Sequence, residues 1–446
     1  MSKRRRRRKL PEPSVVHIEA MSHEGRGIAH IDGKTVFVFG ALKGEEVRIQ
    51  IHKANRNYDE AITLDVIQAS AKRVRPECDA FDVCGGCSLQ HMDNDDQVVF
   101  KQQSLVEMMA HAGINVGQVI PALRSKAWGY RRKARLGVKY VHKKGRVLVG
   151  FRERNTRYLA DMSRCEVLVP EVGHRLQALA GLIESLEARE SIPQIEVACD
   201  DHHVALVFRN LRDLSDTDTE KLIDFAKSNE FWIQLQPGGP DSITNLYPYK
   251  QPLYFSPLEN DDIKIGFKVI DFTQVNAGIN QQMVKQALDY LDLNKQDRVL
   301  DLFCGLGNFS LPMARLCSTV TGVEADLAMV TRAKQNALEH GIVNSDYFVA
   351  DLTRLDPDTG WMKQQYDKIL IDPPRSGALE IAKSIARFNA RVLVYVSCQP
   401  SSLVRDSKII CDNGYRLTHL GIMDMFPQTA HVESMAIFEQ QRGHSN

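Results

Sequence analysis

The second half of the chain alternates between short apolar runs and longer amphipathic segments, and this alternation restricts the possible folds more than any other feature. From about residue 270, the apolar runs end in polar or glycine-rich turns: DRVLDLFCG, TVTGVEAD, SDYFVADL, YDKILIDPPRSG and RVLVYVSCQP. Helical patterns such as QQMVKQALDYLD and AMVTRAKQNALEHG separate several of them. Strands that alternate with helices predict a parallel, doubly wound, Rossmann-like α/β sheet, with ligands at the carboxyl ends of its strands.

The chain of 446 residues is too long for a single hydrophobic core, and its pattern changes along its length. Residues 1–11 contain seven consecutive positive charges, which predict a disordered basic tail. Residues 12–70 contain five short runs of strand character with glycine-rich turns, which predict a small OB-like β-barrel. We expect a mixed α+β central domain at residues 71–268 and the α/β domain at residues 269–446.

The composition argues against a membrane protein. The chain is 43% hydrophobic and 25% charged, and no apolar run approaches the roughly 18 residues of a membrane helix. The basic N-terminal run is not followed by the apolar segment of a secretory signal. We therefore expect a cytoplasmic, monomeric protein with no membrane contact, in a compartment where disulfides rarely persist.

A long basic stretch predicts contact with nucleic acid. Residues 109–152 contain eleven Lys or Arg and no Asp or Glu, with Trp128, Tyr130, Tyr140 and Phe151 interleaved. Positive charges neutralise phosphates and aromatic faces stack on unpaired bases, which together favour a surface for single-stranded RNA. The alternative is a solvated basic hairpin whose aromatic side chains belong to the core.

Acidic residues follow three successive strands and predict the cofactor. The first strand of the α/β domain runs into the glycine-rich stretch DLFCGLGN, residues 301–308, which would let a ligand approach the backbone closely. Glu324 ends the next strand, and Asp351 and Asp372 follow the two after it. Three acids at one edge disfavour a pyrophosphate and tolerate a cationic sulfonium, so we expect S-adenosylmethionine and not NAD. Taken singly, each acid could instead be a helix cap.

A cysteine and a glutamate at the predicted edge suit one methylation reaction in particular. Cys398 follows the strand VYVS, and Glu433 precedes another apolar strand. Carbon 5 of uracil becomes nucleophilic only after a thiolate has added to carbon 6, and a base must later remove the carbon-5 proton. Methylation of an amino group needs neither residue. Considered alone, Cys398 would be an inert buried thiol and Glu433 a surface acid.

Four further cysteines have the composition of a metal site. Cys78, Cys84 and Cys87 are spaced C-x5-C-x2-C, and a lone Cys165 follows. Four thiolates suit either a tetrahedral zinc ion or an iron–sulfur cluster, and the spacing leaves both open.

The motifs DLFCGLGNFS, DPPRSG, VSCQP and HVES, in this order, resemble those of the RNA uracil-5-methyltransferases over the whole α/β domain. The resemblance implies that Cys398 is the nucleophile and Glu433 the general base. It also implies a set of residues that line the S-adenosylmethionine pocket: Gln274, Phe303, Asn308, Glu324, Asp351 and Asp372.

Two further features resemble one subgroup of that family. Its members carry a [4Fe–4S] cluster on four cysteines arranged like Cys78, Cys84, Cys87 and Cys165, and residues 14–70 resemble the RNA-binding TRAM domain. The form with this barrel acts on a uridine of 23S ribosomal RNA, which is therefore the expected substrate. The alternatives are a methyltransferase for a base nitrogen or a protein amide, which would not use Cys398, and a non-catalytic RNA-binding protein.

Overall fold

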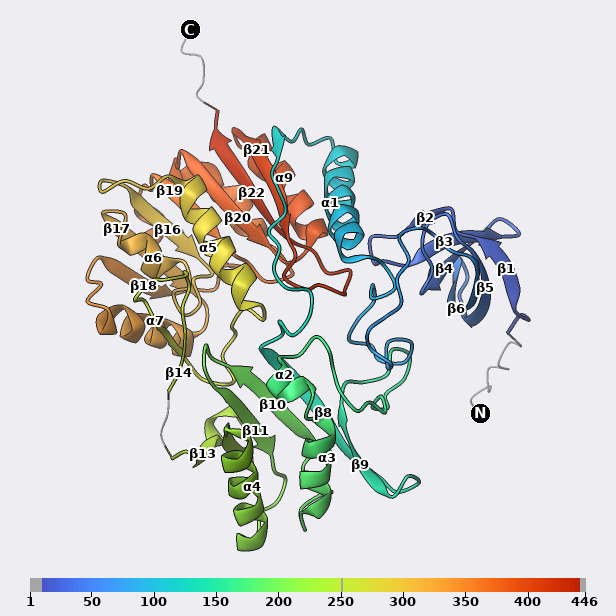
Figure 1. The fold of residues 1–446 in the computed structure, drawn as a ribbon. Coiled ribbons are helices and arrows are strands. Elements are labelled where there is room, and N and C mark those ends of the chain that lie inside the picture. Colours follow the sequence, from blue (N-terminus) through green and yellow to red (C-terminus); the bar gives the residue numbers. More distant parts are fainter. Residues whose placement is uncertain (1–9, 250–251, 442–446) are drawn as a thin grey trace, which may run out of the picture. The chain divides into compact units, whose positions relative to one another are not determined.

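The computed structural model describes residues 10–249 and 252–441, so nearly all of the predicted basic tail lies outside the described residues. The chain forms two compact units (Figure 1). Unit 1 contains the chain up to Lys101 together with residues 152–157 and 427–431, and unit 2 contains the rest. Both units therefore include segments that are distant in sequence, whereas the four domains predicted above were continuous segments and remain a prediction.

Unit 1 contains a six-stranded sheet in the order β1-β5-β6-β4-β3-β2. Its strands are β1 (Ser14–His17), β2 (Ala20–Met21), β3 (Gly27–Ile31), β4 (Lys34–Phe39), β5 (Glu46–Ala54) and β6 (Tyr58–Gln68). Alternate residues of β4 and β5 point into one core, as the period of two predicts. The sheet has one strand more than the five expected, because the first expected run, VVHIEAM, forms two strands, β1 and β2.

The carboxylate of Glu45, directly before β5, is fully buried. Arg73 donates to it from Nε at 2.6 Å and from Nη2 at 2.7 Å, and the backbone N–H of Leu42 donates at 2.8 Å. A buried charge is tolerated when it is paired and hydrogen-bonded, so this ion pair ties the sheet to the segment that follows it.

Unit 2 contains a six-stranded sheet formed by the middle of the chain, in the order β13-β12-β11-β10-β8-β9. Its strands are β8 (Lys133–Val141), β9 (Arg146–Gly150), β10 (Gln194–Cys199), β11 (Val204–Arg209), β12 (Phe231–Gln236) and β13 (Thr244–Tyr247). Its helices are α2 (Pro170–Gly173), α3 (Leu176–Ser185) and α4 (Asp216–Asn229), with the short η1 (Pro240–Ser242). The helix α1 (Asn94–His111) begins in unit 1 and ends in unit 2.

The second sheet of unit 2 has eight strands in the order β18-β17-β16-β19-β20-β22-β21-β7. Its strands are β7 (Gln118–Val119), β16 (Arg298–Leu302), β17 (Thr319–Glu324), β18 (Ser345–Val349), β19 (Lys368–Ile371), β20 (Val392–Ser397), β21 (Tyr415–Met423) and β22 (Glu433–Gln440). The strands from β18 to β20 are parallel, and β22 runs antiparallel to β20. This confirms the predicted Rossmann-like sheet.

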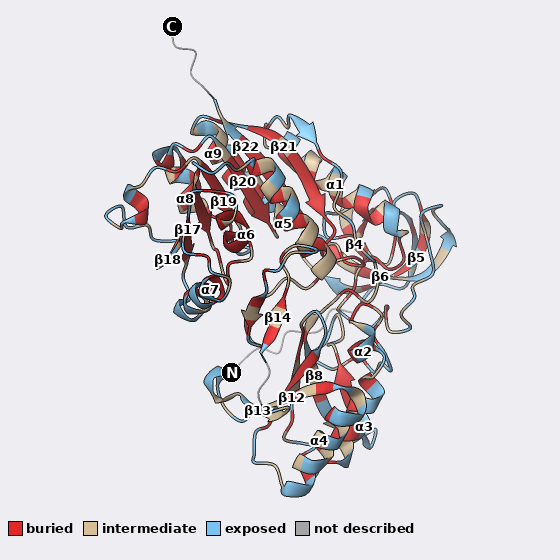
Figure 2. Cartoon of the chain, turned by 60° about the vertical axis from the view of Figure 1, so that its left-hand side comes forward, coloured by how far each residue is buried: buried red, intermediate tan, exposed pale blue. Residues whose placement is uncertain are grey.

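Helices cover this sheet, whose central strands are almost wholly buried (Figure 2). They are α5 (Ala277–Leu291), α6 (Ser310–Ala314), α7 (Leu327–Glu339), α8 (Leu379–Ser384) and α9 (Pro400–Asp412), with η2 (Trp361–Lys363) and η3 (Ile385–Phe388). A small hairpin, β14 (Leu253–Phe255) and β15 (Ile265–Phe267), precedes α5. None of the helices in the described part of the chain is long and apolar enough to cross a membrane.

The strand order fixes where a ligand can bind. From β16 the sheet continues to β17 and β18 on one side and to β19 and β20 on the other. The loops after β16 and β19 therefore diverge, which opens a crevice at the carboxyl ends of these strands. Every acid predicted to line the cofactor pocket follows or ends one of these strands.

Candidate active site

The loop between β16 and α6 has a backbone that few sequences can adopt. Phe303, Gly305 and Gly307 all have positive φ values, of 64°, 54° and 93°. Two of these positions are glycines, which adopt such angles without strain, and only Phe303 carries a cost. Glu324, at the end of β17, accepts from the N–H of Gly305 at 3.3 Å and from the N–H of Ala325 at 2.7 Å. The loop and the acid are thus held together at the edge of the sheet where the sequence analysis expected both.

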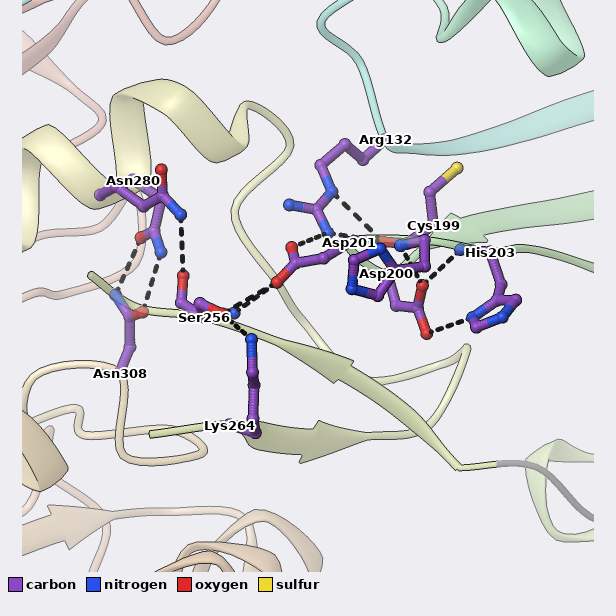
Figure 3. Close-up of polar contacts among 11 residues, drawn as sticks. Arg132, Cys199, Asp200, Asp201, His203, Ser256, Lys264, Asn280 and Asn308 are labelled. Carbon is purple, nitrogen blue, oxygen red and sulfur yellow. Dashed lines mark hydrogen bonds and ion pairs between the residues drawn. The ribbon is translucent and has the colours of Figure 1, made fainter. Parts of the chain in front are cut away.

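Asn308 is held in place by a side chain that the sequence analysis missed. Its amide forms two reciprocal hydrogen bonds with that of Asn280 on α5, at 2.9 and 3.0 Å (Figure 3). Gln274 lines a small cavity together with Asn280, Arg132 and Ser256. Asn280 lies just before the helical pattern QQMVKQALDYLD, and no local signal identified it as the partner of Asn308.

A polar chain lies beside this cavity (Figure 3). Arg132 donates to Asp201 at 3.0 Å, and Asp201 accepts from the backbone N–H and the hydroxyl of Ser256 at 2.9 and 3.0 Å. Lys264 donates to the same hydroxyl at 2.6 Å. These hydrogen bonds fix the end of β14 and the start of β8 beside the cavity that Gln274 lines.

The carboxylates at the strand ends differ in their surroundings. Asp301 is fully buried in β16, where Ser310 donates to it, and burial raises its pKa to about 7. Removal from water likewise raises the pKa of Asp372 to about 7. Asp351 is exposed two residues beyond β18, and hydrogen bonds from the hydroxyl and N–H of Thr353 lower its pKa. Asp301, which was not predicted as a site residue, is therefore more enclosed than the predicted Asp351.

The structure brings Cys398 and Glu433 together. Ser397 at the end of β20 pairs with Ser434 near the start of β22, so the next residue on one strand faces the preceding residue on the other. Glu433 is only 6% exposed. Burial and the charge of Asp372 raise its pKa to about 8, against a smaller opposite effect of Arg375. Burial and the charges of Glu433 and Asp372 raise the pKa of Cys398 to about 12. The thiol is therefore a weaker acid here than an ordinary cysteine.

The DPPRSG loop after β19 is clamped by a buried network that the sequence analysis also missed. Asp406 on α9 accepts from the hydroxyl of Tyr395 at 2.7 Å and from the backbone N–H of Ala378 at 2.7 Å. Arg405 donates to the carbonyl of Ser376 at 2.8 Å. The network fixes the loop that carries Asp372 and Arg375, the two charges that act on the Cys398 and Glu433 pair.

Three of the four predicted metal ligands lie on one loop of unit 1, the cysteine loop (residues 78–87). Cys84 and Cys87 are buried and Cys78 is half-buried, whereas Cys165 is buried within unit 2. The N–H of Gly86 donates to the sulfur of Cys84 at 3.4 Å. Arg154 donates to the carbonyls of Cys84 and Cys87 at 2.9 and 2.6 Å. Within the described residues, no three His, Cys, Asp or Glu side chains are gathered as a metal site.

The basic stretch acquires acidic partners from elsewhere in unit 2. Arg132 pairs with Asp201 at 3.0 Å, and Arg135 with Glu196 at 2.5 Å. Asp161 pairs with both Lys144 and Arg146. At least four of the eleven basic side chains of the stretch therefore have acidic partners in the fold.

The aromatic residues of this stretch differ in their exposure. The side chain of Tyr130 is buried, which removes it from the predicted stacking surface, while Trp128 and Tyr140 remain partly exposed.

A glycine-rich loop at the topological switch point, beside the half-buried thiol of Cys398 and the buried carboxylate of Glu433, defines a Rossmann-like ligand-binding domain. Comparison with known proteins gives the particular family. The sequence profile of the tRNA (Uracil-5-)-methyltransferase family matches residues 93–441, and that of the TRAM domain matches residues 15–64. The chain therefore belongs to the uracil-5-methyltransferase family and carries a TRAM domain.

Two curated relatives match almost end to end. One, from Xanthomonas campestris pv. campestris, is 46% identical over 96% of this chain and 98% of its own length. The other, from Alkalilimnicola ehrlichii, is 48% identical over 98% of this chain and 99% of its own length. Both are named 23S rRNA (uracil(1939)-C(5))-methyltransferase RlmD.

A solved structure shares the fold. The tRNA (uracil-54, C5)-methyltransferase of Pyrococcus abyssi, in complex with S-adenosyl-L-homocysteine, aligns with a TM-score of 0.71 at 21% identity. The alignment covers 95% of this chain and all of that one.

Proposed function

We propose that this chain methylates carbon 5 of one uridine in 23S ribosomal RNA, with S-adenosylmethionine as the methyl donor. The observation that carries the proposal is the pairing of β20 with β22, in which Ser397 lies opposite Ser434. This register supports a contact between the neighbouring Cys398 thiol and the buried Glu433 carboxylate at the expected cofactor edge. The names of the near full-length relatives support the ribosomal substrate and the position numbered 1939. A ribosomal RNA substrate also supports the expected cytoplasmic location.

Cys398 acts first, as the nucleophile. Its sulfur adds to carbon 6 of a uracil flipped out of its stack, and electron density moves to carbon 5 and the carbonyl at carbon 4. Because its pKa is about 12 in the free protein, the thiolate must be favoured by positive charge. Arg375 supplies some of that charge, and S-adenosylmethionine, when bound, supplies a cationic sulfonium with a transferable methyl group.

Glu433 acts second, as the base. After carbon 5 is methylated, Glu433 removes the remaining carbon-5 proton, the bond between carbon 6 and the sulfur breaks, and the aromatic ring returns. A carboxyl with a pKa of about 8 suits this role, because a base works best when its pKa lies near the operating pH.

The binding site for S-adenosylmethionine would consist of the loop at Phe303 and the side chains around it. Glu324 would accept from ribose hydroxyls, as an acid at the end of a second strand does. Asn308 and Gln274 both lie beside Asn280: Asn308 forms hydrogen bonds with its amide, and Gln274 lines the same small cavity. The acids Asp351 and Asp372 complete the set and suit a cationic ligand.

The test uses a trapped adduct. RNA with 5-fluorouridine at the target carries no removable carbon-5 proton, so the wild-type protein should form a stable covalent complex. We expect Cys398→Ala to bind S-adenosylmethionine but to form no adduct and no 5-methyluridine. Cys411→Ala, at a half-buried thiol on α9, is the matched control and should react normally. Normal turnover by Cys398→Ala would refute the mechanism and favour methylation of a nitrogen.

A [4Fe–4S] cluster held by Cys78, Cys84, Cys87 and Cys165 is part of the proposal. The donor set suits it, because four thiolates hold such clusters and backbone N–H groups that donate to their sulfurs tune them. The Gly86 N–H already donates to Cys84. The cluster would supply a structural tie for the cysteine loop. We expect Cys84→Ser to lose iron and the broad visible absorbance, while Cys199→Ser keeps both. Zinc in place of iron in the purified protein would contradict this assignment.

A further inference from the structure

Asn276 carries a buried donor that the fold leaves unused. The residue is 2% exposed and is the N-cap of α5, where its side-chain oxygen accepts from the N–H of Ile279 at 3.3 Å. That bond fixes which side of the amide is oxygen and which is nitrogen. The nitrogen, Nδ2, is buried and has no hydrogen-bond partner among the described residues. A buried donor without a partner is costly, so a ligand is the natural acceptor.

The start of α5 lies at the catalytic edge of the sheet. The helix packs against β20, and its Leu291 end leads into the first residue of β16, so its beginning lies near the carboxyl ends of the parallel strands. The side chains of Ile279 and Met283 share a core with Val396 of β20 and Met435 of β22. Asn276 is therefore on the same side of the sheet edge as Cys398.

A second connection leads from Asn276 to Glu433. Met423 at the end of β21 pairs with Glu433, and Leu123 forms a bridge with Met423. Two residues further on, Ser125 packs against the first turn of α5, where a Cβ at Gly278 would lie 2.6 Å from its hydroxyl. The segment from Leu123 to Ser125 thus connects the surroundings of Glu433 with the first turn of α5.

The neighbouring turn of α5 serves the cofactor loop instead. Asn280, one turn further along, is occupied by its two hydrogen bonds to Asn308 (Figure 3). Asn276 has no such bond to that loop in the described structure, and it lies one turn nearer the start of the helix. Asn280 therefore orients the cofactor loop, whereas the side-chain donor of Asn276 is left for the second substrate.

We propose that Nδ2 of Asn276 donates to the carbonyl oxygen on carbon 4 of the target uracil, and so helps to select uridine. The proposal rests on the proposed function. Uracil presents an acceptor at carbon 4, where cytosine presents an amino donor. An amide N–H can donate to the carbonyl of uracil, whereas it would face another donor in the amino group of cytosine. A site built to hydrogen-bond a substrate group strongly rejects an analogue that leaves its buried partner unpaired.

The variant Asn276→Asp separates the two roles of the side chain. Aspartate is as good an N-cap as asparagine, so the helix start is kept while the donor is lost. We expect kcat/KM for an RNA carrying the target uridine to fall about 10- to 100-fold, since a buried hydrogen bond is lost. The Kd for S-adenosylmethionine should stay within about twofold. Asn276→Ser, which also caps the helix, should show the same pattern, and thermal unfolding of both variants controls for stability.

Covalent trapping gives the specific readout. With RNA carrying 5-fluorouridine or 5-fluorocytidine at the target position, the wild-type protein should trap the first and discriminate strongly against the second. In Asn276→Asp this preference should fall at least about tenfold, because the carboxylate accepts from the cytosine amino group. An unchanged preference, or a loss confined to S-adenosylmethionine affinity, overturns the inference. Failure of the wild-type protein to trap 5-fluorouridine would instead count against the proposed function.

Discussion

Replacing Glu433 with glutamine should stabilise the protein at alkaline pH while it blocks the last step of the reaction. Burial and the charge of Asp372 raise the pKa of Glu433 to about 8 from an ordinary value of 4.5. Between those two pH values the folded chain holds a proton that the unfolded chain has lost. The free energy of unfolding therefore falls as the pH rises through this window, and the loss is complete above about pH 8.

The size of the effect follows from the two pKa values. Each pKa unit corresponds to 1.36 kcal/mol, so the difference between 4.5 and about 8 corresponds to about 5 kcal/mol. Glutamine has nearly the same shape and cannot ionise. Relative to wild type, Glu433→Gln should therefore gain up to about 5 kcal/mol between pH 5 and pH 9.

Urea denaturation at pH 5, 7 and 9, without RNA or cofactor, measures this difference. Glu439→Gln is the matched control, because Glu439 lies on the same strand with a half-exposed side chain. In the same preparations, Glu433→Gln should accumulate a methylated RNA–protein adduct, since the carbon-5 proton cannot leave. A stability difference that does not change with pH would refute the reasoning about burial, and rapid product release would remove Glu433 from its role as base.

Three other variants test the fold around the sites. Arg73→Ala should lower the stability of unit 1 by about 3–5 kcal/mol in urea denaturation, because it leaves the fully buried carboxylate of Glu45 unpaired; an unchanged midpoint would contradict this. Gly322→Ala should cost about 1–3 kcal/mol of stability, since its Cβ would lie 2.6 Å from the ring of Tyr347, and unaltered thermal unfolding would show that the ring can move. Arg154→Ala removes the donors to the cysteine-loop carbonyls and should therefore speed the loss of iron to a chelator. Visible absorbance measures this rate, and Arg157→Ala is the control. Equal rates in the two variants would argue that Arg154 does not support the loop.

Several features of this chain are local and could be predicted from its sequence. The spacing of apolar residues indicated the strands and helices of the α/β domain, because each element satisfies its own periodicity. The glycines at 305 and 307 indicated a loop that a ligand could approach closely, and the structure adds that both have positive φ values. Glu324 and Asp372 were placed correctly at strand ends, since parallel strands bring their carboxyl ends to one edge.

The tertiary structure alone decided the chemistry of those residues. The register of β20 against β22 depends on contacts between segments more than thirty residues apart, and it sets both the proximity of Glu433 to Cys398 and the burial that raises both pKa values. The acidic partners of the basic stretch come from other strands and loops. The free donor of Asn276 is equally invisible in the sequence, since any N-cap asparagine looks alike until the fold shows whether its nitrogen has a partner. Periodicity reports which face of an element is apolar, but burial, pairing and charge compensation depend on which distant elements meet.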